Sequence, residues 1–503
     1  MKDFLLVSPI IVPLLGGLFL IGFWGKVKLA RIVSLLIVLI VAALAFHLLH
    51  KVLHSGILVT NLGDWDAPFG IVLVADLFGV LMVAVTSLIS LISFTFVVLF
   101  HDTTRGNYIH PFLLFLLAGV NGVFMTGDLF NLFVFFEVTL VSSYALIAIG
   151  AKRIQIEAAF KYVVINVMAS AFLLIGIGLV YGEVGTLNMA HIAVRSAALE
   201  NSGMLTVASM FLLTAFGVKS AIVPLHFWLP GAYTYIPSGV AIFFGAVLTK
   251  VGVYSMIRVF GFALNYEHTL FQPIMLTIAC LSILIGILGA LGQRDLRTIL
   301  SWDVISQVGF MFLGLSLFTV ASLGASIFFM LQYMPTKAGL FVVSGVIERS
   351  SGTGNIYRLG GLARIYPWMA GMFLILALSL SGIPPLAGFW AKLGLLQASF
   401  GLHSISGYIA SVIILLGSIL TGFMMMKIWQ WVFWGQPQDS SIKQKAISLR
   451  DHWKYLIPLT MALGLALSMV IWVGDIYEVS NRAASQILNP EQYIEAVNLA
   501  EFE

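Results

Sequence analysis

Residues 367–400 have the sequence PWMAGMFLILALSLSGIPPLAGFWAKLGLLQASF, and this stretch decides the fold. It is strongly apolar and holds a single charged residue, Lys392. A helix that crosses a bilayer needs about 20 apolar residues, so the stretch is too long for one straight span. Pro384 and Pro385 lack backbone donors and clash with the preceding helical turn. The stretch therefore predicts a membrane helix that is broken near its centre and carries a lysine after the break.

The rest of the chain has the same apolar character. Of its 503 residues, 60% are hydrophobic and 10% are charged, whereas soluble domains carry roughly 25% charged residues. The net charge of +4 comes from cations in short loops, so we expect no nucleic-acid partner. One cysteine, Cys280, cannot form an intrachain disulfide or hold an iron–sulfur cluster, and no dinucleotide or phosphate motif occurs. We therefore expect no cofactor and no metal site.

Apolar runs predict an all-α polytopic integral membrane protein with about fourteen transmembrane helices. The first run is interpreted as a retained helix, not a signal peptide, because its positive charges follow the apolar part and no small-residue cleavage pattern occurs. The predicted spans lie at 4–24, 30–50, 71–100, 108–126, 129–150, 159–181, 204–224, 238–262, 272–291, 298–316, 320–346, 367–400, 407–434 and 453–474.

The seventh span is predicted to be broken as well. Pro224 follows Lys219, and the chain continues as the irregular, aromatic-rich PLHFWLPGAYTYIP. Two broken helices five spans apart suggest the inverted repeats of many transporters. We therefore predict one membrane domain over 1–503. It divides into N-terminal helices (1–107), a first repeat (108–262), a second repeat (272–434), and a last helix with a polar tail (435–503).

Positive charges predict the orientation in the membrane. They follow the odd-numbered spans, except the seventh, and are few after the even-numbered ones, so the odd loops are expected to be cytoplasmic and both termini outside. These charges are Lys26, Lys28, Arg31, Arg105, Lys152, Arg153, Lys161, Arg294, Arg297, Arg349, Arg358, Arg364, Lys443, Lys445, Arg450 and Lys454.

Several ionisable residues lie inside the predicted spans. Each costs roughly 2.5–3.5 kcal/mol on insertion scales, so each is a functional candidate. They are Glu137, Lys219, Lys250, Lys337 and Lys392. The alternative for the lysines is that their ammonium groups extend to the membrane surface. The alternative for Glu137 is a structural ion pair.

Buried lysine suits proton transfer. Burial disfavours the charged ammonium, whereas a nearby carboxylate favours it, so a Glu–Lys pair that opens and closes can load and release a proton. A helix break admits the water that a proton path needs. Lys219 and Lys392 both lie close to a predicted break.

Three other polar residues favour structural roles. Lys427 lies beside tryptophans near a predicted inner helix end, where its ammonium can reach the interface. Asp128 and Asn131 open the fifth span, where an acid and an amide suit a helix N-terminus.

Several motifs resemble the antiporter-like subunit family. They are GDLFNLFVFFE, GVKSAIVPLHFWLPGAY, GAVLTKVGVY, RTILSWDVISQVGF and LSGIPPLAGFWAKLGLLQASF, and they cover roughly residues 70–435 in the family's order. This family includes the proton-pumping membrane subunits of respiratory complex I and membrane hydrogenases, and the two large subunits of Mrp-type multisubunit sodium/proton antiporters. The length of the chain and Tyr233 in LPGAY resemble the D-type Mrp subunit.

The resemblance implies roles for four residues. Glu137 matches the family's key glutamate, and Lys219 matches the lysine that pairs with it. Lys250 matches the connecting lysine, and Lys392 the terminal lysine. It also implies a bacterial cell-membrane complex in which the other Mrp subunits and membrane lipid are partners, and in which protons are exchanged for sodium along a hydrated axis.

Two positions depart from the family pattern. Asp303 in SWDVISQVG stands where relatives commonly have a histidine. Tyr333 in LQYMPTK stands where a histidine usually precedes the lysine, here Lys337, by one turn. The resemblance places both positions on the central axis, so Asp303, Tyr333 and Lys337 are second-rank candidates for proton transfer.

The sequence leaves other functions open. A proton-pumping subunit of a complex I-like or hydrogenase redox complex would carry nearly the same residues. A structural scaffold with an inactive channel is favoured by the two missing histidines but opposed by the retained Glu137 and lysines. A stand-alone sugar or drug carrier lacks support, because no substrate-sized set of polar residues lies mid-span. The sequence therefore favours a transporter subunit, not an enzyme.

Overall fold

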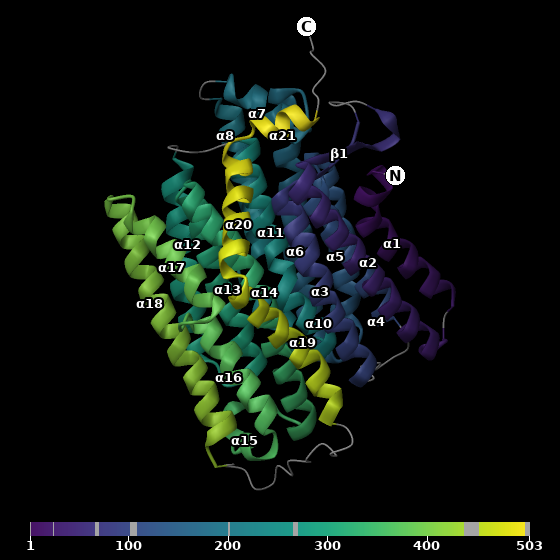
Figure 1. The fold of residues 1–503 in the computed structure, drawn as a ribbon, viewed down its shortest axis with the longest axis vertical. Helices are drawn as coiled ribbons and strands as arrows, with labels where there is room; N and C mark the ends of the chain where they lie inside the picture. Colours follow the sequence, from purple (N-terminus) through teal and green to yellow (C-terminus); the bar gives the residue numbers. More distant parts are fainter. Residues whose placement is uncertain are drawn as a thin grey trace.

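The fold is a bundle of long helices that lie side by side (Figure 1). A computed structural model describes residues 2–23, 25–65, 70–100, 108–199, 202–264, 270–436 and 452–497. Four cations of the predicted cytoplasmic loops, Arg105, Lys443, Lys445 and Arg450, lie outside the described residues.

The helices follow the predicted apolar runs closely, with π-helical turns labelled η2, η3 and η5. They are α1 (Lys2–Gly22), α2 (Val27–Ser55), α3 (Leu77–Phe100), α4 (Ile109–Met125), α5 (Leu129–Ala148), α6 (Arg153–Val184), α7 (Met189–Ala197), α8 (Gly203–Ser220), α9 (Leu229–Tyr235), α10 (Ser238–Phe243), η2 (Phe244–Leu248), α11 (Thr249–Met256), η3 (Ile257–Ala263), α12 (Phe271–Gly292), α13 (Leu296–Ser316), α14 (Val320–Ser351), α15 (Leu362–Ile365), α16 (Pro367–Ser381), α17 (Ala387–Phe400), α18 (Ile405–Ile428), η5 (Trp429–Trp434), α19 (His452–Ile471), α20 (Val473–Leu488) and α21 (Glu491–Val497). Two single 3-10 turns, η1 (Leu62–Asp64) and η4 (Ile356–Arg358), complete the helical elements of the described residues.

Twelve helices of the described chain are long and apolar enough to cross a membrane, and α4 and α16 are shorter apolar helices. The protein is therefore a multi-pass membrane protein, as predicted. The all-α prediction was wrong in one place. The third span begins at Leu77, not at residue 71, because Val72–Ala75 is a strand, β2, that pairs antiparallel with β1 (Leu58–Asn61). A strand and a helix of continuous apolar sequence cannot be separated by periodicity alone.

Both predicted helix breaks are present. In the first, α8 ends at Ser220, and the indole Nε1 of Trp228 donates to the carbonyl of Val218 at 2.9 Å. In the second, α16 ends at Ser381 and α17 begins at Ala387. Gly382 between them has φ of +85°, a conformation that favours glycine. Each break thus leaves helix-terminal carbonyls inside the bundle.

Two backbone closures in different halves of the chain have the same form. The 32-residue α6 is followed by Gly-Thr-Leu-Asn (185–188), and the 32-residue α14 by Gly-Thr-Gly-Asn (352–355). In each closure the asparagine forms an antiparallel bridge with an aspartate that caps another helix: Asn188 with Asp128 of α5, and Asn355 with Asp295 of α13. The first closure lies next to α7 and the second near α15, at opposite ends of the bundle (Figure 1).

The centre of the bundle consists of α14 and the continuous helix from α10 to η3. Both are buried along the whole apolar part of their length. Helix α14 packs against α3, α10, α13, α16, α17, α19 and α20. Because these two spans face protein on all sides, they can carry polar side chains without exposing them to lipid.

The two ends of the described chain lie at the same end of the bundle, where α1 begins and α21 ends (Figure 1). We call this the terminal end and the other the opposite end. The polar tail predicted after the last span is helical in its described part, as α20 and α21. It is not loose, because α20 packs along α14 and α3.

Candidate functional site

Glu137 and Lys219 are connected by a hydroxyl group that the sequence did not indicate. Ser170 of α6 donates to Glu137 Oε1 at 2.5 Å, and Lys219 Nζ donates to Ser170 Oγ at 3.1 Å. Among the described residues no ion pair joins Glu137 and Lys219 directly, and the contact between them runs through Ser170. The structure thus brings the two residues near one another, with α6 between their helices.

Lys219 lies in the last turn of α8, just before the break, and only 5% of it is exposed. Its ammonium also donates to the carbonyl of Asn166 at 3.4 Å and lies 5.7 Å from the ring centre of Phe136. A cavity of about 10 Å³, close to the size of one water molecule, adjoins it and is lined partly by Thr139 and Tyr162. The ammonium of Lys219 can therefore exchange one hydrogen-bonding partner for another within its site.

Lys250 follows a π-helical turn in the buried central span. Its ammonium donates to the carbonyl of Gly245 at 3.1 Å and to Thr249 Oγ1 at 3.2 Å. It also lies 3.9 Å from the ring centre of Tyr333 on α14. π-Turns are common at functional sites because they displace backbone carbonyls from the regular pattern. Gly252 of the same span lets α8 approach closely, since a Cβ there would lie 2.9 Å from the carbonyl carbon of Lys219.

Lys337 and Asp303 form a fully buried ion pair. Lys337 Nζ lies 2.6 Å from Asp303 Oδ2, and both side chains are fully shielded from solvent. The other carboxylate oxygen accepts from Gln307 Nε2 at 2.9 Å. Lys337 is also 5.7 Å from the ring centre of Tyr333, so this ring lies between Lys250 and Lys337. The second-rank candidates thus form one connected group.

Lys392 turns back toward the helix break. Its ammonium donates to the carbonyls of Leu380 at 2.9 Å and Ser381 at 3.3 Å, the last residues of α16. It lies 4.9 Å from the ring centre of Phe310 on α13. A Cβ on Gly382 would lie 2.9 Å from Lys392 Cδ, so glycine is needed here for space as well as for its φ.

The structure decides between the two interpretations of the buried lysines. Lys219, Lys250, Lys337 and Lys392 are all buried with partners inside the bundle, so they do not extend to the membrane surface. The structural roles of two other groups are confirmed. Lys427 donates to the carbonyl of Leu291 at 2.7 Å at the end of α12. Asp128 caps α5 by accepting from Asn131 N at 2.8 Å.

Sequence analysis missed a buried pair near the terminal end. Arg258 of η3 contacts both carboxylate oxygens of Asp76 at 2.8 Å, and each side chain is at most 3% exposed. Tyr254 accepts from Arg258 at 2.8 Å, and the ring of Tyr493 on α21 lies 5.6 Å away. A charge within VYSMIRVFGFA was the available signal. The pair ties the central span to the start of α3 and to α21.

Arg297 was predicted to lie in the loop before the tenth span, but it lies inside a helix. It is buried in the first turn of α13, where it pairs with Glu348 at 2.6 Å and donates to the carbonyl of Ile236 at 2.9 Å. It therefore fixes the junction between α9 and α10, next to the first broken helix.

The fold and the site together define a class: a polytopic membrane protein with a line of buried lysines and carboxylates between two broken helices. A family model described as NADH:quinone oxidoreductase/Mrp antiporter, TM matches residues 126–421. The D subunit of the Na(+)/H(+) antiporter of Alkalihalophilus pseudofirmus is 40% identical over 98% of this chain and 99% of that protein. The corresponding D subunit of Bacillus subtilis is 36% identical over 99% of each.

Two solved structures agree with this similarity over nearly the whole chain. A chain of the Mrp complex from Dietzia sp. DQ12-45-1b has a TM-score of 0.91 and 31% identity, covering 99% of each chain. A chain of the membrane-bound sulfane sulfur reductase, an archaeal respiratory membrane complex, has a TM-score of 0.87 and 25% identity, covering 99% of each. The protein belongs to the NADH:quinone oxidoreductase/Mrp antiporter family of membrane proteins, within which it is similar to the D subunits of Na(+)/H(+) antiporters.

Proposed function

We propose that this chain is the proton-translocating subunit of a multisubunit sodium/proton antiporter, a transporter subunit and not an enzyme. The observation that carries the proposal is the series of ionisable groups inside the bundle, which runs from the half-buried Glu137 to the buried Lys392. Charged groups inside a membrane protein are costly, and groups kept there mark ion paths. The similarity to the D subunits of two sodium/proton antiporters supports sodium as the exchanged ion.

In the proposed mechanism Ser170 transmits the state of Glu137 to Lys219. While the hydroxyl bridges them, the carboxylate favours the charged ammonium. When the bridge opens, burial favours the neutral amine, and the proton leaves Lys219. Because α8 packs directly against α11 at Gly252, the next acceptor along the chain of lysines is Lys250.

From Lys250 the path continues past Tyr333. The buried phenol oxygen of Tyr333 has no hydrogen-bond partner among the described residues, and neither does that of Tyr233. Buried polar atoms of this kind are suited to internal water. Water beside these phenols would link Lys250 to the Asp303–Lys337 pair. From there Lys392, next to the carbonyls at the second break, is the terminal group.

We also propose the finer architecture. The matching closures at Asp128/Asn188 and Asp295/Asn355, at opposite ends of the bundle, support two inverted repeats over about 108–262 and 272–434 of a single membrane domain. Counting α4 and the broken α16–α17 with the twelve long helices supports about fourteen crossings. The loop cations support an orientation with both termini outside, and the bacterial relatives support a location in the bacterial cell membrane.

The test is cation-dependent proton flux in everted vesicles with the whole operon expressed. Addition of sodium should collapse a preformed pH gradient in the parent, and Glu137→Ala should prevent this while the complex still assembles. A parent that does not respond to sodium but pumps protons on NADH or hydrogen oxidation would replace this proposal with membership of a redox complex. The similarity to the archaeal respiratory complex is the observation that favours this second candidate.

A further inference from the structure

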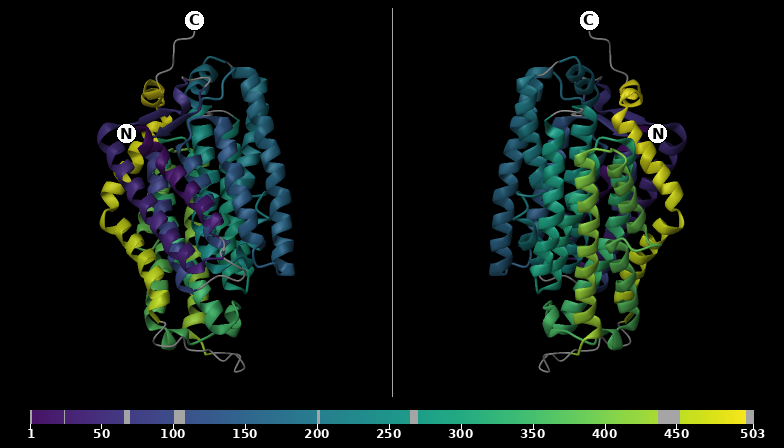
Figure 2. Two further views of the ribbon diagram at one scale, coloured as in Figure 1. Left: turned by 90° about the vertical axis from the view of Figure 1, so that its right-hand side faces the viewer. Right: turned by 90° about the vertical axis from the view of Figure 1, so that its left-hand side faces the viewer.

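The flank formed by α17 and α20 carries charged residues where lipid would be expected. Asp475, Glu478 and Arg482 are spaced three and four residues apart, so they lie on one face of α20, and all three are exposed. The opposite face of α20 is buried against the bundle through residues such as Ala484 and Ile487. Figure 2 shows α20 on the outside of the bundle.

The position of α20 places its two carboxylates at membrane depth. Gln486 Oε1 accepts from Leu77 N at 3.3 Å, which fixes this residue at the end of α3. Asp475 lies eleven residues earlier, or about 16 Å along the helix, whereas half of the hydrocarbon layer is about 15 Å thick. The hydroxyl of Tyr477 lies against Gly394, six residues before the end of α17. Measured from the start of α3, Asp475 therefore lies near the middle of the hydrocarbon layer, and Glu478 lies about one helical turn closer to the terminal end.

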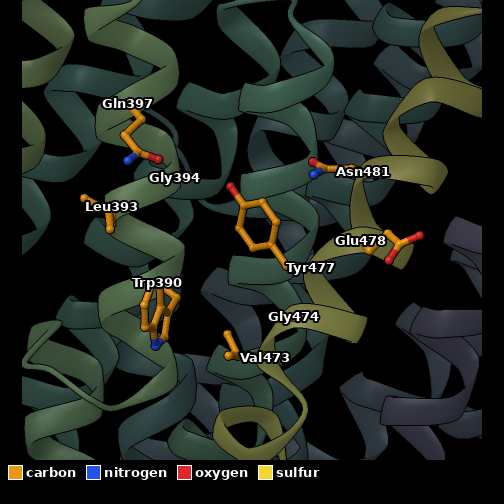
Figure 3. A pocket seen from close by; sticks show the side chains of 9 residues that line it. All are labelled: Trp390, Leu393, Gly394, Gln397, Val473, Gly474, Tyr477, Glu478 and Asn481. Carbon is orange, nitrogen blue, oxygen red and sulfur yellow. The ribbon is translucent and has the colours of Figure 1, made fainter.

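A groove of about 430 Å³ lies between the two helices. Figure 3 shows Trp390 and Gln397 on the α17 wall, and Tyr477 reaching toward them from α20, with Glu478 at the rim pointing away from α17. The amide oxygen of Asn481 is buried against Gly324 of α14, so it faces the bundle and not the groove. A Cβ on Gly474 would meet nothing within 4 Å, so the backbone of α20 is open to close approach there.

We propose that this groove and the charged rim of α20 are the docking site for a transmembrane helix of a neighbouring subunit. The helix would present cationic or hydrogen-bond-donating side chains to Asp475 and Glu478, because the rim has two carboxylates and one guanidinium. Small residues such as Gly474 let membrane helices approach closely. The inference rests on the proposed membership of a multisubunit complex.

An acyl chain fits this surface poorly, because lipid tails cannot compensate two carboxylates. A second groove, of about 490 Å³, lies on the other side of α17 and differs in being almost wholly apolar. Its lining includes Leu396, Phe400, Tyr408 and Val412. That groove suits lipid. The two grooves therefore give a matched pair for the test.

The test places the photo-reactive residue p-benzoyl-phenylalanine at Trp390 or at Tyr408, which are 40% and 43% exposed. The whole operon is expressed and the membranes are irradiated. Position 390 should give an adduct between this chain and another subunit of the complex, whereas position 408 should give lipid adducts without a change in gel mobility. Lipid adducts alone at position 390, or an adduct with a second copy of this chain, would overturn the proposal.

A charge reversal gives an independent measurement. Glu478→Lys should lower the amount of other subunits that co-purify with this chain several-fold, whereas Glu495→Lys, an exposed site on α21, should not. Equal co-purification of both variants would contradict the proposal. Neither measurement depends on transport, so the two proposals can fail separately. A cross-linked complex without sodium-dependent proton flux would reject only the proposed function. An active complex without the cross-link would reject only the docking site.

Discussion

In the first half of the chain a hydroxyl group separates the acid from its lysine, whereas in the second half the two charges touch. Glu137 is half-buried and reaches Lys219 through Ser170, while Asp303 and Lys337 meet at 2.6 Å in full burial. Separating a buried pair leaves an uncompensated charge, at a cost of about 3–5 kcal/mol when one partner is removed. A pair that is bridged by a hydroxyl and has a half-buried acid can separate at a smaller cost in free energy.

This difference assigns different tasks to the two sites. The first site is suited to a switch between paired and separated states, because the Ser170 hydroxyl can release either Glu137 or Lys219. The second is suited to holding a charge in the centre of the bundle, between Lys250 and Lys392. The following changes test this division, beginning with the largest expected effect.

Asp303→Asn should have the largest effect. It leaves Lys337 buried without its carboxylate and should destabilise the protein by about 3–5 kcal/mol, seen as a lower midpoint of thermal aggregation for the purified complex. The double variant Asp303→Asn with Lys337→Met should recover much of this loss, since both charges are gone. Glu137→Gln is the matched change at the first site and should shift the midpoint far less. Equal shifts at the two sites would remove the contrast.

Lys219→Ala should reduce sodium-dependent proton flux by roughly tenfold or more, the scale expected for removal of a proton-transfer group. The midpoint of thermal aggregation should change little, because Glu137 is only half-buried and keeps its hydrogen bond from Ser170. Lys427→Ala is the control, since that lysine binds helix-terminal carbonyls outside the site. Flux in everted vesicles measures both. If the Lys219 variant had the same flux as the parent, the Glu137–Ser170–Lys219 site would not be the site that loads and releases the proton.

Ser170→Ala should lower the flux about fivefold, because it removes two hydrogen bonds to charged groups, each of about 1.5–3 kcal/mol in net terms. Ser170→Thr retains the hydroxyl and should recover part of the flux. Ser142→Ala is the control, because that hydroxyl donates to the carbonyl of Val138 in its own helix. If alanine and threonine at position 170 gave the same flux, the hydroxyl would not be the connecting group.

Gly382→Ala should have the smallest effect. It places a Cβ at φ of +85° and 2.9 Å from Lys392 Cδ, which should cost about 1–2 kcal/mol, and it should lower the flux about twofold by displacing Lys392. Gly371→Ala on the preceding helix, α16, meets nothing within 4 Å and should behave as the parent does. Identical flux and thermal midpoints in the two variants would show that the second break tolerates displacement of Lys392.

Much of the helical framework could be predicted because membrane crossing depends on local composition. The apolar runs predicted most helix positions to within a few residues, and the prolines predicted both breaks. The strand at Val72–Ala75 was missed because IVLVA is as apolar as the helix that follows it. The packing of α20 was missed because its polar residues resemble those of a loose tail.

Most charged groups of the candidate site were singled out from the sequence, whereas its neutral groups were not. Glu137 and the lysines are conspicuous in an apolar chain, whereas Ser170 resembles the many hydroxyl residues of the spans. Asp76 lies between a strand and a helix, so its pairing with Arg258 depends on contacts between distant segments.

The sequence by itself determined which segments lie in the membrane and which charges are kept inside it, because the free energy of transferring a residue into lipid depends mainly on its own chemistry. Only the tertiary structure decided which of these charges meet. Asp303 and Lys337 are 34 residues apart in the chain, and Ser170 comes from a third helix to connect Glu137 with Lys219. Such contacts arise from the packing of whole helices, at Gly252, at Gly382 and around α14, and this packing depends on shape across the entire bundle.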